Sequence, residues 1–162
     1  MMVAAKEVEV ETKIGDLAVR RSIEINAPPE RVWEEFTSAE RMRSWFLVDR
    51  LEYEPRAGGK FEAEGGGPDH PKHKVRFIFT GEVLVYDPPR EMTYSMGWSP
   101  PQWPDVTYVT FRLTPMEGGR TRVELTHYGF ERLGEQARET YEGFEGGWDL
   151  TYLEALRGIV ER

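Results

Sequence analysis

Residues 148–159 read WDLTYLEALRGI, and their apolar side chains recur every three or four positions. This spacing is typical of one face of an α-helix, so the stretch predicts a helix with a buried stripe. The stripe consists of Trp148, Tyr152, Ala155, Leu156 and Ile159. The helical pattern reaches back to about residue 133, with a break predicted at the glycines of residues 143–147. No other part of the sequence has so long a helical pattern, so this helix should form one layer of the fold.

The sequence before this helix has the pattern of an antiparallel sheet. Short stretches alternate apolar and polar residues and are separated by turns rich in glycine and proline. The expected strands are residues 8–14, 17–25, 48–54, 60–64, 74–86, 91–98, 106–114 and 120–128. Two short helices are expected between the second and third of these strands, with Pro28 and Pro29 opening the first and Ser38 as N-cap of the second.

These elements predict an α+β fold in which a curved antiparallel sheet wraps around the long C-terminal helix. A chain of 162 residues can bury a core as one domain, so we expect a single domain over residues 1–162. Residues 1–16 are expected to be a lead-in that can add an edge strand. Exposed edges invite pairing, which leaves both a monomer and a homodimer open.

Composition narrows the partners and the compartment. The net charge is −8 and the basic residues are scattered among glutamates, so neither a nucleic acid nor an anionic membrane surface is an expected partner. No apolar run reaches the length of a membrane span or of a signal peptide, so no membrane insertion is expected. The absence of cysteine excludes disulfides and thiolate metal sites and fits a reducing compartment. We therefore expect a cytoplasmic protein without a bound metal or cofactor.

Several sequence motifs along the chain, in this order and spacing, resemble those of one known group of proteins. The motifs are residues 25–36 (INAPPERVWEEF), 43–46 (RSWF), 55–61 (PRAGGKF), 81–90 (GEVLVYDPPR), 92–98 (MTYSMGW) and 119–127 (GRTRVELTH), followed by the terminal helix. They resemble the START-like superfamily (SRPBCC, helix-grip, birch-pollen-allergen-like), and within it the family of homologues of the activator of heat-shock-protein-90 ATPase. The resemblance runs from about Val19 to the C-terminus.

The resemblance implies a cavity between sheet and long helix, which superfamily members use for lipids, sterols, polyketides and similar molecules. It implies no particular reaction. The eukaryotic activators also carry an additional N-terminal domain that engages the chaperone. Because this chain has only a short acidic lead-in before its first family strand, a chaperone partner is the less favoured expectation.

The best candidate function is therefore non-catalytic binding of a small hydrophobic ligand in a cavity of several hundred Å³. Alternation along the strands puts aromatic and methionine side chains on the inner face of the sheet, and two aromatic residues of the helix can close the space. The ligand-binding candidates are Trp45, Phe46, Phe61, Phe77, Phe79, Tyr94, Met96, Trp98, Phe111, His127, Trp148 and Tyr152. Of these, Trp45 and Phe46, together with Trp103, are expected at the rim. Each aromatic residue is also compatible with simple core packing.

His127 is the one catalytic candidate. It is in line with Val123 and Leu125, so it should face inward, where it could serve as a general base or hydrogen-bond a ligand. The favoured alternative is a neutral core histidine with internal partners. His70 and His73, beside Asp69, have the spacing of metal ligands, but their place in a glycine-rich loop makes a metal site the less favoured interpretation.

Charged residues on the strands give two further alternatives. The carboxylates Asp49, Glu52, Glu54, Glu62 and Glu64 could pair for acid–base chemistry, although a solvated face explains them better. Arg21, Arg76 and Arg112 interrupt apolar alternation, and they either reach into the cavity or lie on the outer face.

Two other function classes stay open. An enzyme of cyclase, dehydratase or hydrolase type would use His127, Tyr94 or an inward arginine in the same cavity. An interaction module would need an exposed apolar patch, for which the loop containing Trp98, Pro100, Pro101, Trp103 and Pro104 is the candidate.

Overall fold

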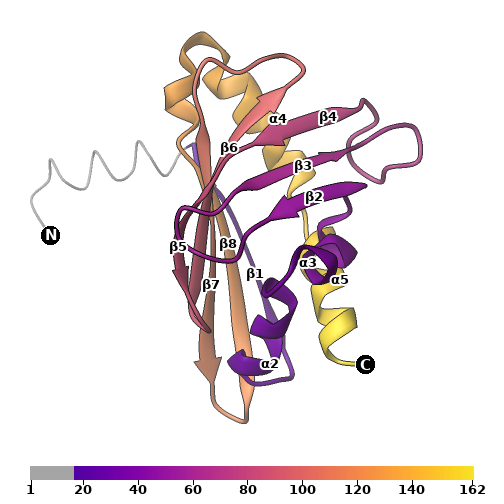
Figure 1. The fold of residues 1–162 in the computed structure, drawn as a ribbon, viewed down its shortest axis with the longest axis vertical. Helices are drawn as coiled ribbons and strands as arrows, with labels where there is room; N and C mark the ends of the chain where they lie inside the picture. Colours follow the sequence, from indigo (N-terminus) through magenta and orange to yellow (C-terminus); the bar gives the residue numbers. More distant parts are fainter. Residues whose placement is uncertain (1–16) are drawn as a thin grey trace, which may run out of the picture.

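An antiparallel sheet of eight strands forms the main layer of the computed structural model, which describes residues 17–162 (Figure 1). The strands are β1 (Val19–Ile25), β2 (Arg50–Tyr53), β3 (Phe61–Gly65), β4 (Phe77–Thr80), β5 (Val83–Asp87), β6 (Glu91–Ser99), β7 (Thr107–Met116) and β8 (Arg120–Tyr128). Their order across the sheet is β1-β8-β7-β6-β4-β3-β2, and β5 pairs with β6. The strand expected over residues 8–14 falls outside the described residues.

The two short helices lie between β1 and β2, as expected. The first is α2 (Pro29–Trp33), which starts at a proline and continues as a 3₁₀ turn, η1 (Glu34–Phe36). The second is α3 (Ala39–Phe46), and Ser38 is its N-cap, because the Ser38 hydroxyl oxygen accepts a hydrogen bond of 3.1 Å from the backbone N–H of Arg41.

The C-terminal helical region covers the inner face of the sheet (Figure 1). It consists of the 3₁₀ segment η2 (Phe130–Gln136), α4 (Ala137–Gly147) and α5 (Thr151–Val160). The predicted break is present and falls directly after Gly147, at the residues between α4 and α5. Strands, short helices and terminal helices together confirm the α+β, helix-grip fold.

One predicted strand is divided in two. Residues 74–86 were expected to form a single strand, but β4 ends at Thr80 and β5 starts at Val83. At Gly81 the backbone presses against β6, and a Cβ there would be only 1.8 Å from the carbonyl oxygen of Ser95. This close approach requires glycine and interrupts the regular ladder. Val75, which the single strand would turn inward, is 70% exposed.

The core lies between the sheet and the helices, and the expected alternation holds in the strands that face it. The inward residues of β6, β7 and β8 are buried: Met92, Tyr94, Met96, Val109, Phe111, Leu113, Val123, Leu125 and His127. These residues lie directly opposite one another on adjacent antiparallel strands, as Met92, Phe111 and Leu125 do. Their side chains therefore lie together on one face of the sheet.

Candidate functional site

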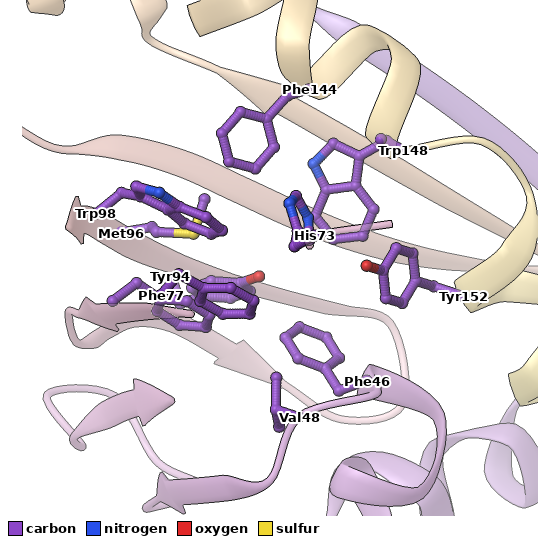
Figure 2. A pocket seen from close by; sticks show the side chains of 12 residues that line it. Phe46, Val48, His73, Phe77, Tyr94, Met96, Trp98, Phe144, Trp148 and Tyr152 are labelled. Carbon is purple, nitrogen blue, oxygen red and sulfur yellow. The ribbon is translucent and has the colours of Figure 1, made fainter. Parts of the chain in front are cut away.

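A small apolar cavity lies where β4 and β6 face the break between α4 and α5 (Figure 2). Its lining comes from α3, the segment after α3, the β3–β4 loop, the sheet and the two terminal helices. The lining residues are Phe46, Val48, His73, Phe77, Phe79, Tyr94, Met96, Trp98, Phe144, Gly147, Trp148 and Tyr152. The space open to the centre of a water molecule is about 30 Å³, enough for one or two waters.

This volume corrects the expectation of several hundred Å³. Stacked aromatic rings fill most of the space between the sheet and the terminal helices. Phe77 stacks on Trp98 with ring centroids 4.3 Å apart, and Phe61 stacks on Tyr94 at 3.9 Å. The space left in this structure is therefore too small for anything but water, and a larger ligand needs the lining to move.

Local structure explains how these side chains meet. Tyr94, Met96 and Trp98 alternate along β6 and therefore share its inner face. Phe144 and Trp148 lie four residues apart, and Tyr152 follows after another four, so one side of the broken helix supplies three rings.

Most of the residues expected to bind a ligand line this cavity, but four do not. Trp45 is fully buried in α3, where its indole N–H donates to the carbonyl oxygen of Glu35 at 3.2 Å, so it is a core residue and not a rim residue. Phe111 packs against Trp45, and Phe61 lies behind Tyr94. His127 is the fourth.

His127 is a core histidine with internal hydrogen-bond partners, which was the favoured alternative to a catalytic role. The indole N–H of Trp148 donates to Nδ1 of His127 at 2.8 Å, and an indole can only donate, so Nδ1 carries no proton. The proton is then on Nε2, which donates to the Thr107 hydroxyl at 2.8 Å. Burial lowers the pKa of His127 to about 3. With both nitrogens occupied and no exposed surface, the ring is unavailable to a substrate.

Val48, His73, Phe144 and Gly147 also line the cavity and were not among the expected residues. The four-residue spacing from Phe144 to Trp148 and Tyr152 is a signal that could have identified Phe144. His73 has no such signal, because the path of the β3–β4 loop (residues 66–76) brings it there.

The β3–β4 loop closes one side of the cavity. Its His73 ring lies 5.2 Å from the Trp98 ring and contacts the Phe77 and Phe144 rings. Burial, reinforced by the neighbouring charges of His70 and Lys72, lowers the pKa of His73 to about 4. The imidazole is therefore neutral at pH 7, as a side chain packed among rings requires.

His70 holds the same loop in shape. Its Nε2 donates to the carbonyl oxygen of Leu47 at 3.0 Å, and its Nδ1 accepts from the backbone N–H groups of Lys72 and His73. Both ring nitrogens of His70 are thus engaged by the backbone, which leaves the His70–His73 pair without the ligand set of a metal site. Between residues 17 and 162 no group of three or more potential metal ligands occurs.

The charged residues of the strands lie on the solvent side. Arg76 pairs with Asp49 and Glu64, and Arg112 pairs with Glu91. Arg21 reaches Glu145 of α4, and Glu52 and Glu54 pair with cations of their own hairpin. None of these side chains lines the cavity, so neither carboxylate chemistry nor an arginine clamp is available there.

The loop after β6 does not form the exposed apolar patch that an interaction module needs. Trp103 is buried, with its ring 5.8 Å from that of Phe144, and Trp98 is half-buried over the cavity. The exposed residues of this loop are Pro100, Pro101, Gln102, Pro104 and Asp105. Trp98 therefore belongs to the cavity lining, and Trp103 is a buried residue beside it.

Comparison with known proteins identifies the family. The family model for activator of Hsp90 ATPase homolog 1-like protein matches residues 26–161. No functionally curated protein matches the chain. None of the helices in residues 17–162 is long and apolar enough to span a bilayer.

Solved structures share the fold at low sequence identity. Protein MLL2253 from Mesorhizobium loti is 25% identical with a TM-score of 0.69, over 90% of this chain and 97% of that one. CalU16 from Micromonospora echinospora is 26% identical with a TM-score of 0.59, over 86% and 75%. Protein NE0264 from Nitrosomonas europaea is 20% identical with a TM-score of 0.70, over 91% and 96%. With the family model covering most of its length, the chain belongs to the family of activator of Hsp90 ATPase homolog 1-like proteins.

Proposed function

We propose that this protein binds a small apolar molecule, without catalysis, in the cavity between the sheet and the terminal helices. The observation that carries the proposal is the lining itself, in which aromatic and methionine side chains from four separate parts of the chain meet around unfilled space. Such apolar, concave sites with few polar groups are typical of small-molecule binding. Among the described residues that line the cavity, His73, Tyr94 and Tyr152 carry the acid–base groups and no Ser, Thr, Cys, Lys, Asp or Glu is present, which favours binding over catalysis.

A surface groove gives this cavity a route to solvent. The groove has about 370 Å³ open to water centres and runs between α4 and the loop after β6. His73, Trp98 and Phe144 line both the groove and the cavity, so these three side chains are the partition between them. Displacing the partition would join the two volumes into a site of ligand size.

Of the three side chains of the partition, His73 comes from the β3–β4 loop, whereas Trp98 is in β6 and Phe144 is in α4. The loop begins at Gly66 and Gly67, both with positive φ, and carries His73 between the sheet and α4. An ion pair between Lys72 and Asp149 fastens it to the junction of α4 and α5. Partial burial alone would raise the pKa of Asp149, but hydrogen bonds from Lys72 and Thr151 lower it to about 2. The carboxylate therefore stays charged, and the pair intact, down to well below pH 4.

Native mass spectrometry tests the proposal directly. The protein would be purified from its source organism, weighed under native conditions and weighed again after denaturation. A retained small molecule, lost on denaturation, is the expected result, and its mass identifies the ligand class. A bare polypeptide that also fails to bind apolar probes in titration would contradict the proposal.

Replacing Lys72 with Met should speed ligand entry. Both partners of the ion pair are partly exposed, so its loss should favour the open loop by about 0.5–1 kcal/mol, or about two- to fivefold. Stopped-flow measurement of the quenching of tryptophan fluorescence by 2-acetylnaphthalene would give the association rate, which should rise by the same factor.

Lys60→Met is the matched control, because Lys60 loses the same charge but pairs with Glu52 on the β2–β3 hairpin, outside the cavity lining. An association rate unchanged by Lys72→Met, or raised equally by both substitutions, would show that this loop does not control entry.

A further inference from the structure

The surface groove beside the cavity is a separate hollow with a lining of its own. It has about 370 Å³ open to water centres, which is the size of a small-molecule site. One wall is a face of α4, where Gln136, Glu139 and Gly143 recur at three- and four-residue spacing, and the facing wall is the loop after β6, with Pro101 and Trp103. Figure 1 shows α4 and this loop at the same end of the sheet. Because the groove lies at the surface, a ligand can enter it without displacing the partition.

The inner wall of the groove is aromatic. The Trp98 and Trp103 rings lie 6.1 Å apart and within 23° of parallel. The Phe144 ring packs against both, at 5.2 Å from Trp98 and 5.8 Å from Trp103. Such a wall suits the apolar part of an organic molecule, and an aromatic ring in particular, because ring contacts add to the gain from burial.

The polar side chains of the groove are all hydrogen-bond acceptors on one turn of α4. They are the carboxylate of Glu139, the amide of Gln136 and the hydroxyl group of Thr140. Within residues 17–162, none of these three side chains has a hydrogen bond or an ion pair. The groove therefore offers several unoccupied acceptors beside an apolar wall.

The charge of the groove is negative. Glu139 is its only charged lining residue among those the structure describes, since no Lys or Arg lines the groove and the imidazole of His73 is neutral at pH 7. The nearby carboxylate of Asp105, by contrast, is already paired with Arg132 at 3.1 Å. The N-terminal turn of α4 favours an acidic residue at position 139 but supplies no cation. An uncompensated carboxylate in an apolar concavity concentrates its field there, so the groove attracts a cation.

The lining also restricts the kind of cation. Metal ions such as Ca²⁺ take six or more oxygen ligands, whereas this groove has one carboxylate, and residues 17–162 contain no group of three or more potential metal ligands. An ammonium group is a better match, because it has three N–H donors for the acceptors of α4 and can carry an apolar group for the rings.

We propose that the surface groove binds an aromatic ammonium ion, with its ammonium group at Glu139 and its ring against Trp98, Phe144 and Pro101. This site goes beyond the proposed binding in the cavity. It lies outside the cavity and needs no opening of the partition, so either proposal can fail without the other.

Three probes of similar shape test the charge preference: the 2-phenylethylammonium ion, neutral 2-phenylethanol and the anion 3-phenylpropanoate. In an NMR titration at pH 7.4, the ammonium ion should shift the indole N–H signals of Trp98 and Trp103 and leave that of Trp148, which lines the cavity, in place. It should bind about three- to fivefold more tightly than the alcohol, and the anion should bind more weakly than both. Raising NaCl from about 50 mM to about 500 mM should remove most of the difference between the ammonium ion and the alcohol.

Glu139→Gln identifies the carboxylate. The substitution should lower the affinity for the ammonium ion by about three- to fivefold and leave the affinity for the alcohol unchanged. Glu117→Gln is the matched control, because Glu117 carries the same charge at an exposed position in the turn between β7 and β8, outside the groove lining. It should change neither affinity.

The outcomes separate this site from the cavity. Equal affinity for the ammonium ion and the alcohol, or equal losses in Glu139→Gln and Glu117→Gln, would overturn the inference. Shifts at Trp148 without shifts at Trp103 would place the probe in the cavity, which would support the proposed binding function and overturn the groove site.

Discussion

Lowering the pH from 7 to 5 should reduce the free energy of unfolding by about 2 kcal/mol through His127 alone. Burial lowers the pKa of His127 to about 3 in the folded protein, whereas the pKa of a histidine in an unfolded chain is about 6.5. Between pH 6.5 and pH 3, His127 is therefore protonated in the unfolded chain and neutral in the folded protein. The stability contributed by the neutral ring is thus complete above pH 6.5 and is lost as the pH falls toward 3.

Urea denaturation at several pH values would measure the total loss, and His127→Leu should reduce it by about 2 kcal/mol. That variant leaves the Trp148 N–H and the Thr107 hydroxyl unpaired, so it should also be about 2–4 kcal/mol less stable at pH 7. His73→Asn is the comparison variant: it removes the similar pH-dependent contribution of His73, whose pKa burial also lowers, and keeps the contribution of His127. If the variant cannot be folded, NMR titration of the intact protein should find His127 neutral, with its proton on Nε2, at pH 5. Stability that stays flat from pH 7 to 5 would contradict the assignment.

Gly81→Ala should destabilise the protein by about 3 kcal/mol. The new Cβ would lie 1.8 Å from the Ser95 carbonyl oxygen, which is backbone and cannot rotate away. Relief requires β4 and β5 to move from β6, and Ser95 lies between the cavity residues Tyr94 and Met96. Binding of 2-acetylnaphthalene should therefore weaken along with stability.

Gly97→Ala on the same edge of β6 is the matched control. Its nearest neighbour would be a Val106 methyl group at 3.6 Å, an ordinary contact, so the free energy of unfolding should change by less than about 1 kcal/mol. Both variants would be compared by urea denaturation under the same conditions. An equal effect of the two substitutions would show that the Gly81 contact does not constrain the sheet.

The spacing of apolar residues predicted the sheet and the helical layer, because a three-to-four-residue spacing buries one face only in a helix and alternation does so only in a strand. The stripe of residues 148–159 requires a helix against a surface, and the alternation of Tyr94, Met96 and Trp98 requires an inner sheet face. The division of residues 74–86 could not be predicted in this way. It depends on how closely Gly81 approaches β6, which is a contact between strands and has no trace in local alternation.

The candidate site was predictable to the extent that its residues lie on regular elements. Phe77, Phe79, Trp148 and Tyr152 line the cavity because strand and helix fix their direction. His73 could not be predicted, because a loop conformation set by His70 and two glycines places it. The cavity volume was overestimated for a related reason, since alternation assigns side chains to a face but says nothing of how densely their rings stack.

The pairing of β1 with β8 has a consequence for biosynthesis. Val19 lies opposite His127, so the first strand has no partner until roughly a hundred further residues have been made, and contacts of such separation slow folding. Strands β7 and β8 are neighbours in sequence and can pair as soon as both are made, whereas β1 stays without its partner, with its apolar face uncovered, during the synthesis of everything between. A chain arrested before β8 would therefore expose Val19, Ile23 and Ile25, and would be a natural client for the holdase chaperones that meet nascent chains.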